Sequence, residues 1–243
     1  MKNISSMLHS EDAEVESIFK KTYVYKLFLK GDHLKISSRE GAVTLSGKVL
    51  HEAHKMMAQD TANALPGVRS VDNRIEVTGE EAPVNSDRWI AIKVKLALLY
   101  HRSVSGFSTE VFVKDGNVTL KGVAGSTAQK DLTTEYALDI VGVESINNEL
   151  SISKNEIPKE DDRTSNQIID DASITSQVKG TLRVHRSTSI LRPDVETEEG
   201  EVTLTGFAKN LAEKDLVTKL IGDIHGVRSV NNTMTISKGN NAL

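Results

Sequence analysis

The chain has 243 residues, of which 38% are hydrophobic, 26% charged and only 4% aromatic, and its formal net charge is −4. These values are typical of a globular protein of two or three domains, whose cores are built mainly from aliphatic side chains. The absence of cysteine excludes disulfides, thiolate metal sites and a cysteine nucleophile. No apolar run reaches the roughly 18 residues that a membrane-spanning helix needs.

Residues 1–11 form an N-terminal segment without the apolar run of a secretory signal. Two compartments therefore stay open: the cytoplasm if Met1 is the native start, or the periplasm and cell envelope if a signal has been removed. Most of the acidic excess lies in predicted connectors, chiefly Glu80, Glu81 and residues 160–162. Because the remaining segments are close to neutral, we do not expect nucleic acid as a partner.

Two short motifs each occur three times. Gly-x-Val-Thr-Leu-x-Gly begins at Gly41, Gly116 and Gly200, and Gly-Val-x-Ser-Val/Ile-x-Asn begins 26 residues later in each copy, at positions 67, 142 and 226. Offsets of 75 and 84 residues align the copies without insertions. A fixed internal period of this kind indicates repeated structural units. The predicted divisions are repeat 1 at 12–79, a linker at 80–86, repeat 2 at 87–154, an acidic linker at 155–170, repeat 3 at 171–238 and a tail at 239–243.

Each repeat contains the same predicted elements in chain order. Apolar residues at 3, 7 and 11 positions after the leading aspartate predict an amphipathic helix. A short strand, a turn such as Asp115-Gly116 and an alternating strand then predict a β-hairpin. In the alternating strand the inward residues are predicted to be Val43, Leu45, Val118, Leu120, Val202 and Leu204.

A second helix and a third strand complete each repeat. The matching apolar positions that mark this helix are Ala53, Met57, Leu65, Ala128, Leu132, Ile140, Ala212, Leu216 and Ile224. Because a helix joins the second and third strands, these strands should be parallel. The fold class is therefore α+β, with three tandem αββαβ units, each a three-stranded mixed sheet covered on one face by two helices. Asn73, Asn148 and Asn232, at the start of the third strand, are predicted to cap the backbone of the preceding Gly-Val turn with their side chains.

The first helix of repeat 2 has a second apolar stripe that its counterparts lack. It consists of Trp89, Ile92, Leu96, Leu99 and Tyr100, flanked by Arg88, Lys93 and Lys95. One interpretation is that the stripe packs against a neighbouring repeat or another chain. The other is that it enters a lipid surface, with aromatic rings at headgroup depth and basic residues on anionic lipid.

A His-Arg-Ser sequence recurs at the end of the first helix, as His101-Arg102 and His185-Arg186 before a serine. Cations at this position suit the negative end of the helix dipole. The alternative interpretation is an edge that contacts anions.

No pattern in the sequence indicates catalysis or a cofactor. Gly-x-Ser-x-Gly and His-Glu-x-x-His are both absent. The close pair His51 and His54 lacks the further ligands that zinc requires. We therefore expect no catalytic residues, no bound metal and no cofactor.

The leading aspartate, the Gly-x-Val-Thr-Leu-x-Gly motif and the Gly-Val-x-x-Val-x-Asn motif together resemble the BON domain, a bacterial module of this length. The resemblance implies a non-enzymatic binding protein, associated with phospholipid or the cell envelope and with osmotic stress. The implied partners are an anionic phospholipid surface or another envelope protein. An alternative is a cytoplasmic adaptor or ion-responsive protein that binds proteins or cations. The oligomeric state stays open.

Overall fold

The computed structural model describes residues 14–79, 86–153, 169–189 and 191–236. Its contacts define two compact units. The first contains repeat 1 together with residues 169–177, and the second contains repeat 2 together with the chain from residue 178 onward. The sequence predicted three separate repeats, so the inclusion of residues 169–177 in the first unit is a new feature. The connectors, the N-terminal segment and the tail lie almost wholly outside the described residues, and the repeat boundaries stay predictions.

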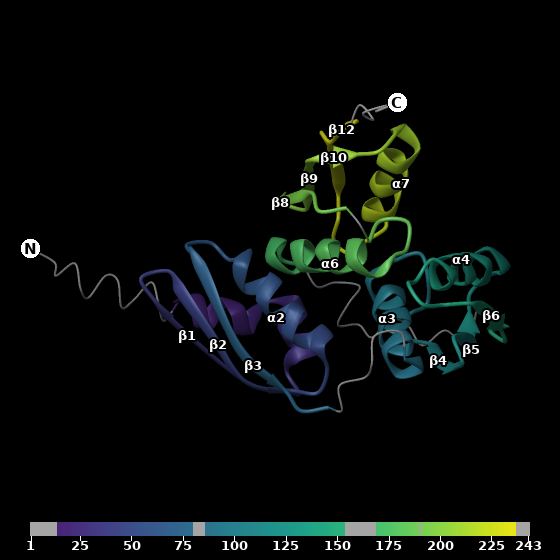
Figure 1. The fold of residues 1–243 in the computed structure, drawn as a ribbon, viewed down its shortest axis with the longest axis horizontal. Helices are drawn as coiled ribbons and strands as arrows, with labels where there is room; N and C mark the ends of the chain where they lie inside the picture. Colours follow the sequence, from purple (N-terminus) through teal and green to yellow (C-terminus); the bar gives the residue numbers. More distant parts are fainter. Residues whose placement is uncertain (1–13, 80–85, 154–168, 190, 237–243) are drawn as a thin grey trace, which may run out of the picture. The chain divides into compact units, whose positions relative to one another are not determined.

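Repeat 1 begins with a helical segment at 14–21. Its further elements are η1 (Tyr25–Leu29), β1 (His33–Arg39), β2 (Ala42–Val49), α2 (Glu52–Asn63) and β3 (Ser70–Val77). β1 is antiparallel to β2, and β3 is parallel to β2. The predicted mixed sheet, with its parallel second and third strands, is confirmed here (Figure 1).

Repeats 2 and 3 have the same topology. In repeat 2 the elements are α3 (Asp87–Tyr100), β4 (Thr109–Lys114), β5 (Asn117–Ala124), α4 (Thr127–Leu138), β6 (Ser145–Asn148) and β7 (Ser151–Ile152). In repeat 3 they are α6 (Asp171–Val184), β8 (Asp194–Glu198), β9 (Glu201–Thr205), β10 (Phe207–Ala208), α7 (Leu211–Gly222), β11 (Ser229–Asn232) and β12 (Thr235–Ile236). The first strand of each repeat is antiparallel to the second, as in the pairs β4–β5 and β8–β9. The strands after the second helix are parallel to their partners: β6 and β7 pair with β5, β11 pairs with β9, and β12 pairs with β10.

The hairpin turns and the buried strand face follow the predicted pattern. Glu40, Asp115 and Glu199 have φ near +50°, and the glycine after each has φ between +74° and +78°. Two successive positive φ angles are typical of the tight type I′ hairpin turn. All six predicted inward residues of the second strand are at most 1% exposed. The alternation of apolar and polar residues therefore identified the buried face correctly.

The second helix buries the residue that follows one of the matched apolar positions. Leu216, which the register matches to Met57 and Leu132, is 37% exposed, whereas the next residue, Val217, is fully buried. The equivalent residues Ala58 and Thr133 are also buried. The helix is rotated so that this position faces the sheet, and the two adjacent apolar residues of α7 could not decide between the two phases.

The asparagines that recur at equivalent positions of the repeats make hydrogen bonds within their own repeat. Asn148 Nδ2 donates to the Lys130 carbonyl oxygen at 2.9 Å and to Thr134 Oγ1 at 2.8 Å, and its Oδ1 accepts from the Leu150 amide at 3.0 Å. Asn232 makes the same three contacts in repeat 3. Each asparagine thus connects the second helix to the third strand. The predicted cap on the backbone of the Gly-Val turn was wrong, because the side-chain NH₂ group bonds to the helix instead.

Repeat 1 departs from the others at its first helix. The helical segment ends at residue 21, and η1 follows as a π-helix. The backbone amide of Tyr23 donates to Asp170 Oδ2 at 2.7 Å, and that of Val24 donates to Ser173 Oγ at 2.9 Å. Asp170 also accepts from the Ser173 amide at 2.9 Å. One aspartate therefore caps both its own helix and the restarted helix of repeat 1.

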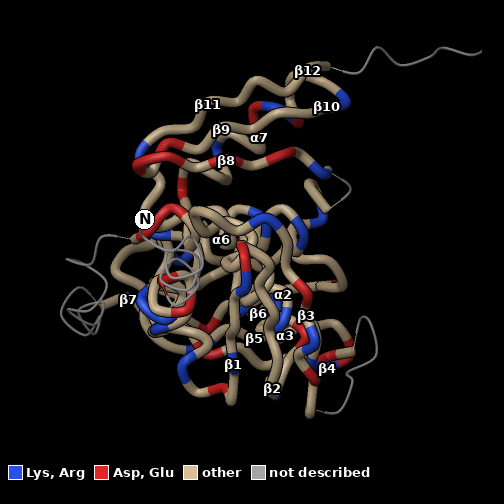
Figure 2. Tube along the Cα trace, turned by 90° about the vertical axis from the view of Figure 1, so that its left-hand side faces the viewer, with Lys and Arg blue, Asp and Glu red and all other residues tan. Residues whose placement is uncertain are grey.

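Charged residues of both signs are distributed along the chain (Figure 2). Among the described residues, the most concentrated acidic segment is the β8–β9 hairpin, with Asp194, Glu196, Glu198, Glu199 and Glu201. Among the described residues no helix is long and apolar enough to cross a membrane.

Candidate functional site

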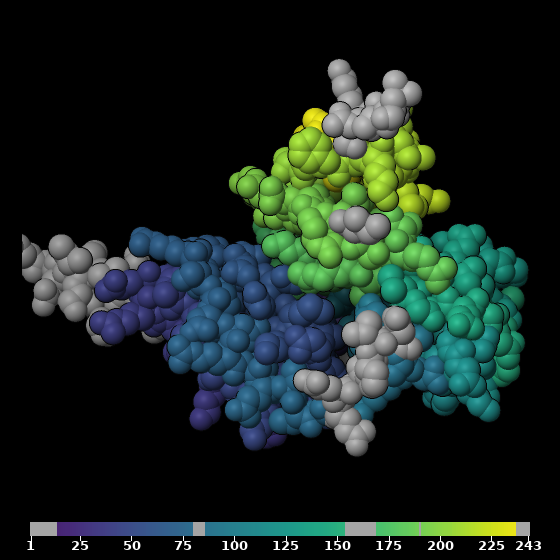
Figure 3. Space-filling model, viewed as in Figure 1, coloured from purple at the N-terminus to yellow at the C-terminus, as the bar shows by residue number. Residues whose placement is uncertain are grey.

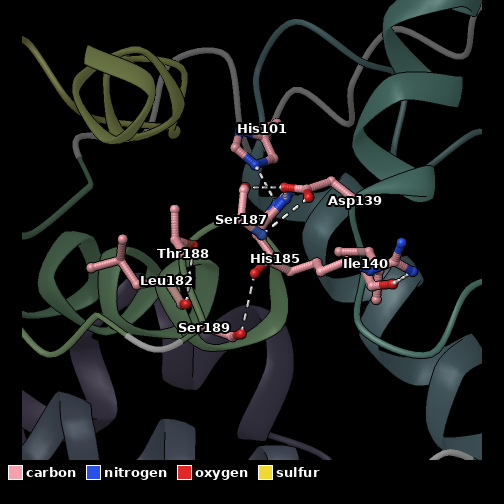
Figure 4. Close-up of polar contacts among 9 residues, drawn as sticks. His101, Asp139, Ile140, Leu182, His185, Ser187, Thr188 and Ser189 are labelled. Carbon is pink, nitrogen blue, oxygen red and sulfur yellow. Dashed lines mark hydrogen bonds and ion pairs between the residues drawn. The ribbon is translucent and has the colours of Figure 1, made fainter. Parts of the chain in front are cut away.

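The two His-Arg-Ser sequences lie together in the second unit. Residues 101–103 follow α3, residues 185–187 follow α6, and each group faces the aspartate that ends the second helix of the other repeat. Figure 4 shows one of these contacts, with Asp139 beside His185 and Ser187. These aspartates are Asp139, after α4, and Asp223, after α7. We call this set of residues the joint. Figure 3 shows the end of α6 against the surface of repeat 2.

The joint has approximate twofold symmetry because equivalent residues of the two repeats make equivalent contacts. His185 Nδ1 lies 3.0 Å from Asp139 Oδ2, and His101 Nδ1 lies 3.5 Å from Asp223 Oδ2. Ser187 Oγ donates to Asp139 at 2.5 Å, and the hydroxyl of Ser103 donates to Asp223. The two histidines meet at the centre, with their Nε2 atoms 3.4 Å apart.

Backbone hydrogen bonds join the two repeats at the same place. The amides of Arg102 and Arg186 donate to the carbonyl oxygens of Asp223 and Asp139, at 2.9 and 2.5 Å. The His225 amide donates to the Tyr100 carbonyl at 3.0 Å, and the Val141 amide donates to the carbonyl of residue 184 at 3.1 Å. These four bonds make short antiparallel bridges between repeats 2 and 3.

The arginine side chains also contact the opposite repeat. Arg102 donates to the carbonyl oxygens of Gly222 at 2.5 Å and Val227 at 3.1 Å, and Arg186 donates to that of Val143 at 2.6 Å. We expected cations to serve the end of their own helix or to form an anion-contacting edge. Instead their donors meet carbonyl groups near the C-terminal ends of helices in the other repeat, where the helix dipole is negative. Anion binding at this edge stays a prediction.

Burial and hydrogen bonding shift the ionisation of the joint. Both histidine side chains are fully buried. Burial lowers the pKa of His101, and Asp223 opposes this effect. Burial alone would raise the pKa values of Asp139 and Asp223. At Asp139 the contacts of His185 and Ser187 outweigh this effect, and at Asp223 the hydrogen bonds from Ser103 and Tyr136 and the nearby His101 do so, and both pKa values lie below the ordinary range.

Tyr136 of α4 breaks the symmetry. Its ring stacks on His101 with centroids 4.1 Å apart, and its hydroxyl donates to Asp223 Oδ2 at 2.7 Å. Burial, reinforced by this bond and the nearby negative charge, raises the pKa of Tyr136 well above its usual range. The hydroxyl therefore acts as a permanent donor to Asp223.

The order of groups in the joint differs from that of a hydrolase. In a Ser-His-Asp triad the histidine lies between the other two and takes the proton of the serine. Here Asp139 lies between Ser187 and His185, and the second nitrogen of His185 faces His101. Among the residues that the structure describes, no group of three or more His, Cys, Asp or Glu side chains could hold a metal ion. The arrangement can link two repeats, and it gives no activated nucleophile.

The predicted apolar stripe of α3 does not form one outward face. Leu96 and Tyr100 are buried, at 8% and 2% exposure, and the Tyr100 ring lies against Gly180 of α6. Trp89 packs on the core of repeat 2. The ring of Trp89 carries the Lys93 ammonium 3.0 Å from its centroid, and burial lowers the pKa of Lys93 to about 8.

The other residues of this predicted surface are divided. Lys95 Nζ donates to the carbonyl oxygens of residues 106 and 109, each at 2.6 Å, so its charge is held within repeat 2. Ile92 and Leu99 are partly exposed, and Arg88 is exposed. Of the stripe residues, Tyr100 therefore packs against a neighbouring repeat, as the first of the two interpretations expected. The N-terminal part of α3 keeps an accessible group formed by Arg88, Trp89, Ile92 and Lys93.

Sequence reasoning missed Asp139, Asp223 and Tyr136. The sequence did contain a signal for the aspartates, which is their occurrence together with His-Arg. Repeat 1 lacks both features, since it has Ala64 in place of the aspartate and Lys26-Leu27 in place of His-Arg. The two repeats with His-Arg-Ser are thus the two with the aspartate.

The chain matches the family model of the BON domain three times, at residues 11–79, 86–154 and 170–238. It is similar to osmotically-inducible protein Y of Escherichia coli (strain K12), with 28% identity over 204 residues that cover 83% of this chain and 96% of that protein. An uncharacterized protein of Anaplasma centrale is 26% identical over 144 residues, covering 59% of this chain and 90% of that protein.

Two solved structures align with most of the chain. One is a structure of CdsD, a structural protein of the type III secretion system of Chlamydia trachomatis. The alignment covers 92% of this chain and 90% of the CdsD chain, with 16% identity and a TM-score of 0.24. The periplasmic domain of the inner membrane protein PrgH from S. typhimurium covers 92% and 99%, with 12% identity and a TM-score of 0.21. At these low TM-scores neither structure implies anything about function.

Proposed function

Because this chain belongs to the BON domain family, we propose that it is a non-enzymatic binding protein of the osmotic-stress response that associates with a phospholipid surface. The observation that carries the proposal is the threefold family match together with the similarity to a protein named as osmotically inducible. The joint supports a binding role over a catalytic one, since its histidines are buried and its serines donate to carboxylates.

The N-terminal part of α3 is the region of the proposed membrane contact. Arg88 is exposed, and Trp89 is partly exposed with the Lys93 ammonium on its ring. Tryptophan rings favour the headgroup region of a bilayer, and basic residues beside them are attracted to anionic lipid. With its pKa near 8, Lys93 is mostly charged at neutral pH, and a negative surface would favour that charge further.

Vesicle flotation tests this proposal directly. The full chain should float with vesicles that contain phosphatidylglycerol and should remain unbound with phosphatidylcholine alone, and Trp89 emission should shift to the blue on anionic vesicles. Arg88→Glu should reduce flotation several-fold. Lys114→Glu, a matched charge reversal at another exposed position of repeat 2, should leave flotation nearly unchanged.

Failure to float with anionic vesicles, or equal losses in both variants, would contradict the proposed contact. The alternative function, an adaptor or ion-responsive protein, predicts a different result for the same sample. In that case, titration of the full chain with potassium or calcium in a calorimeter would release or absorb heat on binding, and titration with vesicles would not.

A further inference from the structure

The buried histidines of the joint require more protons than two neutral imidazoles carry. Three pairs of groups follow one another: Asp139 with His185 Nδ1 at 3.0 Å, the two histidine Nε2 atoms at 3.4 Å, and His101 Nδ1 with Asp223 at 3.5 Å, the last without a hydrogen bond. Ionised carboxylates only accept, so each contact needs one N–H group. A neutral imidazole has one N–H, and the pair therefore supplies two for three contacts.

We propose that the closed joint binds one additional proton on this histidine pair, and that the contact between repeats 2 and 3 is tightest when that proton is bound. One histidine is then an imidazolium that donates to the Nε2 of the other. Without the proton one buried nitrogen has no partner, which is costly in the absence of water. His101 Nδ1 is the nitrogen that makes no hydrogen bond within the described residues.

Of the two histidines, His185 makes the shorter contact with a carboxylate. Its Nδ1 lies 3.0 Å from Asp139, whereas His101 Nδ1 lies 3.5 Å from Asp223, and burial lowers the pKa of His101. A further proton has no acceptor, because two N–H groups would face each other across 3.4 Å. The cluster therefore takes one proton beyond the neutral pair and no more.

The surrounding charges are compatible with a single buried cation. Two carboxylates face the pair, one from the end of each second helix, and both arginines direct their guanidinium groups at carbonyl oxygens. The ionisable groups around the pair, from every element that packs on it, are Arg102, Glu135, Tyr136, Asp139, Arg186, Asp223 and His225. One imidazolium leaves the two histidines and two carboxylates with a net charge of about −1.

A proton bound only in the closed joint makes closing dependent on pH. Above about pH 6.5 the histidines of separated repeats are neutral. The closed joint then holds more protons than the open one, so its stability falls as pH rises. For one proton the change in the closing equilibrium approaches about tenfold per pH unit. The joint is thus a device that loosens toward alkaline pH.

Nuclear magnetic resonance of the full chain with ¹⁵N-labelled histidine tests the proton count. Variants His101→Gln and His185→Gln serve to assign the signals. At pH 7 we expect protons on both Nδ1 atoms and one shared proton between the Nε2 atoms. Signals of two neutral imidazoles, with His101 Nδ1 bare, would overturn the proposal. So would a stoichiometric metal ion in native mass spectrometry, because that ion would occupy the place of the proton.

Amide hydrogen exchange tests the consequence. After correction for intrinsic exchange rates, the bridging amides of Arg102, Val141, Arg186 and His225 should lose protection by up to about tenfold per pH unit as the pH rises above about 6.5. The amides of β5 provide the internal control and should change much less. His185→Gln should abolish the pH dependence of the bridging amides, even if their overall protection is lower. The same pH dependence in bridging and control amides would refute the switch.

Discussion

Replacement of Asp223 by asparagine should weaken the contact between repeats 2 and 3 by about 2–4 kcal/mol. The carboxylate accepts hydrogen bonds from Tyr136 and Ser103, and it lies 3.8 Å from Arg102 Nε. A hydrogen bond to a charged group contributes about 1.5–3 kcal/mol. Asparagine keeps one acceptor but directs an NH₂ group at donors, so one such bond and part of the second are lost.

Urea denaturation of the full chain measures this loss. Trp89 is the only tryptophan, and it packs on the core of repeat 2, so its emission reports the stability of that repeat. Asp215→Asn is the matched control, because Asp215 is exposed on the same helix α7. The control should change the free energy of unfolding by less than about 0.5 kcal/mol. If Asp223→Asn and Asp215→Asn unfold at the same urea concentration, the joint does not stabilise repeat 2.

Three further substitutions test the fold and the joint. Leu120→Ala should lower the free energy of unfolding by about 2–5 kcal/mol, because Leu120 is fully buried. Thr119→Ala, on the opposite face of the strand, should cost less than about 1 kcal/mol, and equal losses in thermal denaturation would refute the strand phase. Asn148→Ala should cost about 1–3 kcal/mol for its lost helix-to-strand contacts, whereas the exposed Asn147→Ala should be nearly neutral by the same measurement. The pKa of Asp139 is lower in the folded protein than in the unfolded chain. Its contribution should therefore be complete above about pH 4 and lost as pH falls further. The stabilities of the parent and Asp139→Asn should accordingly converge in acid, and a constant difference would contradict the shift.

The fold followed from the sequence wherever one pattern allowed one structure. A strand that alternates apolar and polar residues has only one way to bury its apolar side, and Val118 and Leu120 are buried as expected. The second helix of repeat 3 was less determined, because Leu216 and Val217 are both apolar and either could face the sheet. Only the packing of the neighbouring elements selects Val217.

The candidate site could be predicted only in part, because its partners are distant in the sequence. The recurrence of His101 and His185 was visible, but Asp139 and Asp223 each lie 38 positions from the histidine of their own repeat and bond to that of the other. Helical periodicity also placed Tyr100 on an outward stripe. Periodicity describes one helix at a time, and it contains no information about a glycine on α6 that admits the tyrosine ring.

The cap that Asp170 supplies to repeat 1 bears on how the protein is made. Tyr23 and Asp170 are 147 positions apart, and at about 5–20 residues per second a ribosome needs roughly 7 to 30 seconds to synthesise that interval. Throughout this time the amides of Tyr23 and Val24 lack their acceptors, and the first repeat emerges unfinished. The last repeat to be translated completes the first, so premature termination or a truncated transcript would damage the N-terminal repeat as well as remove the C-terminal one.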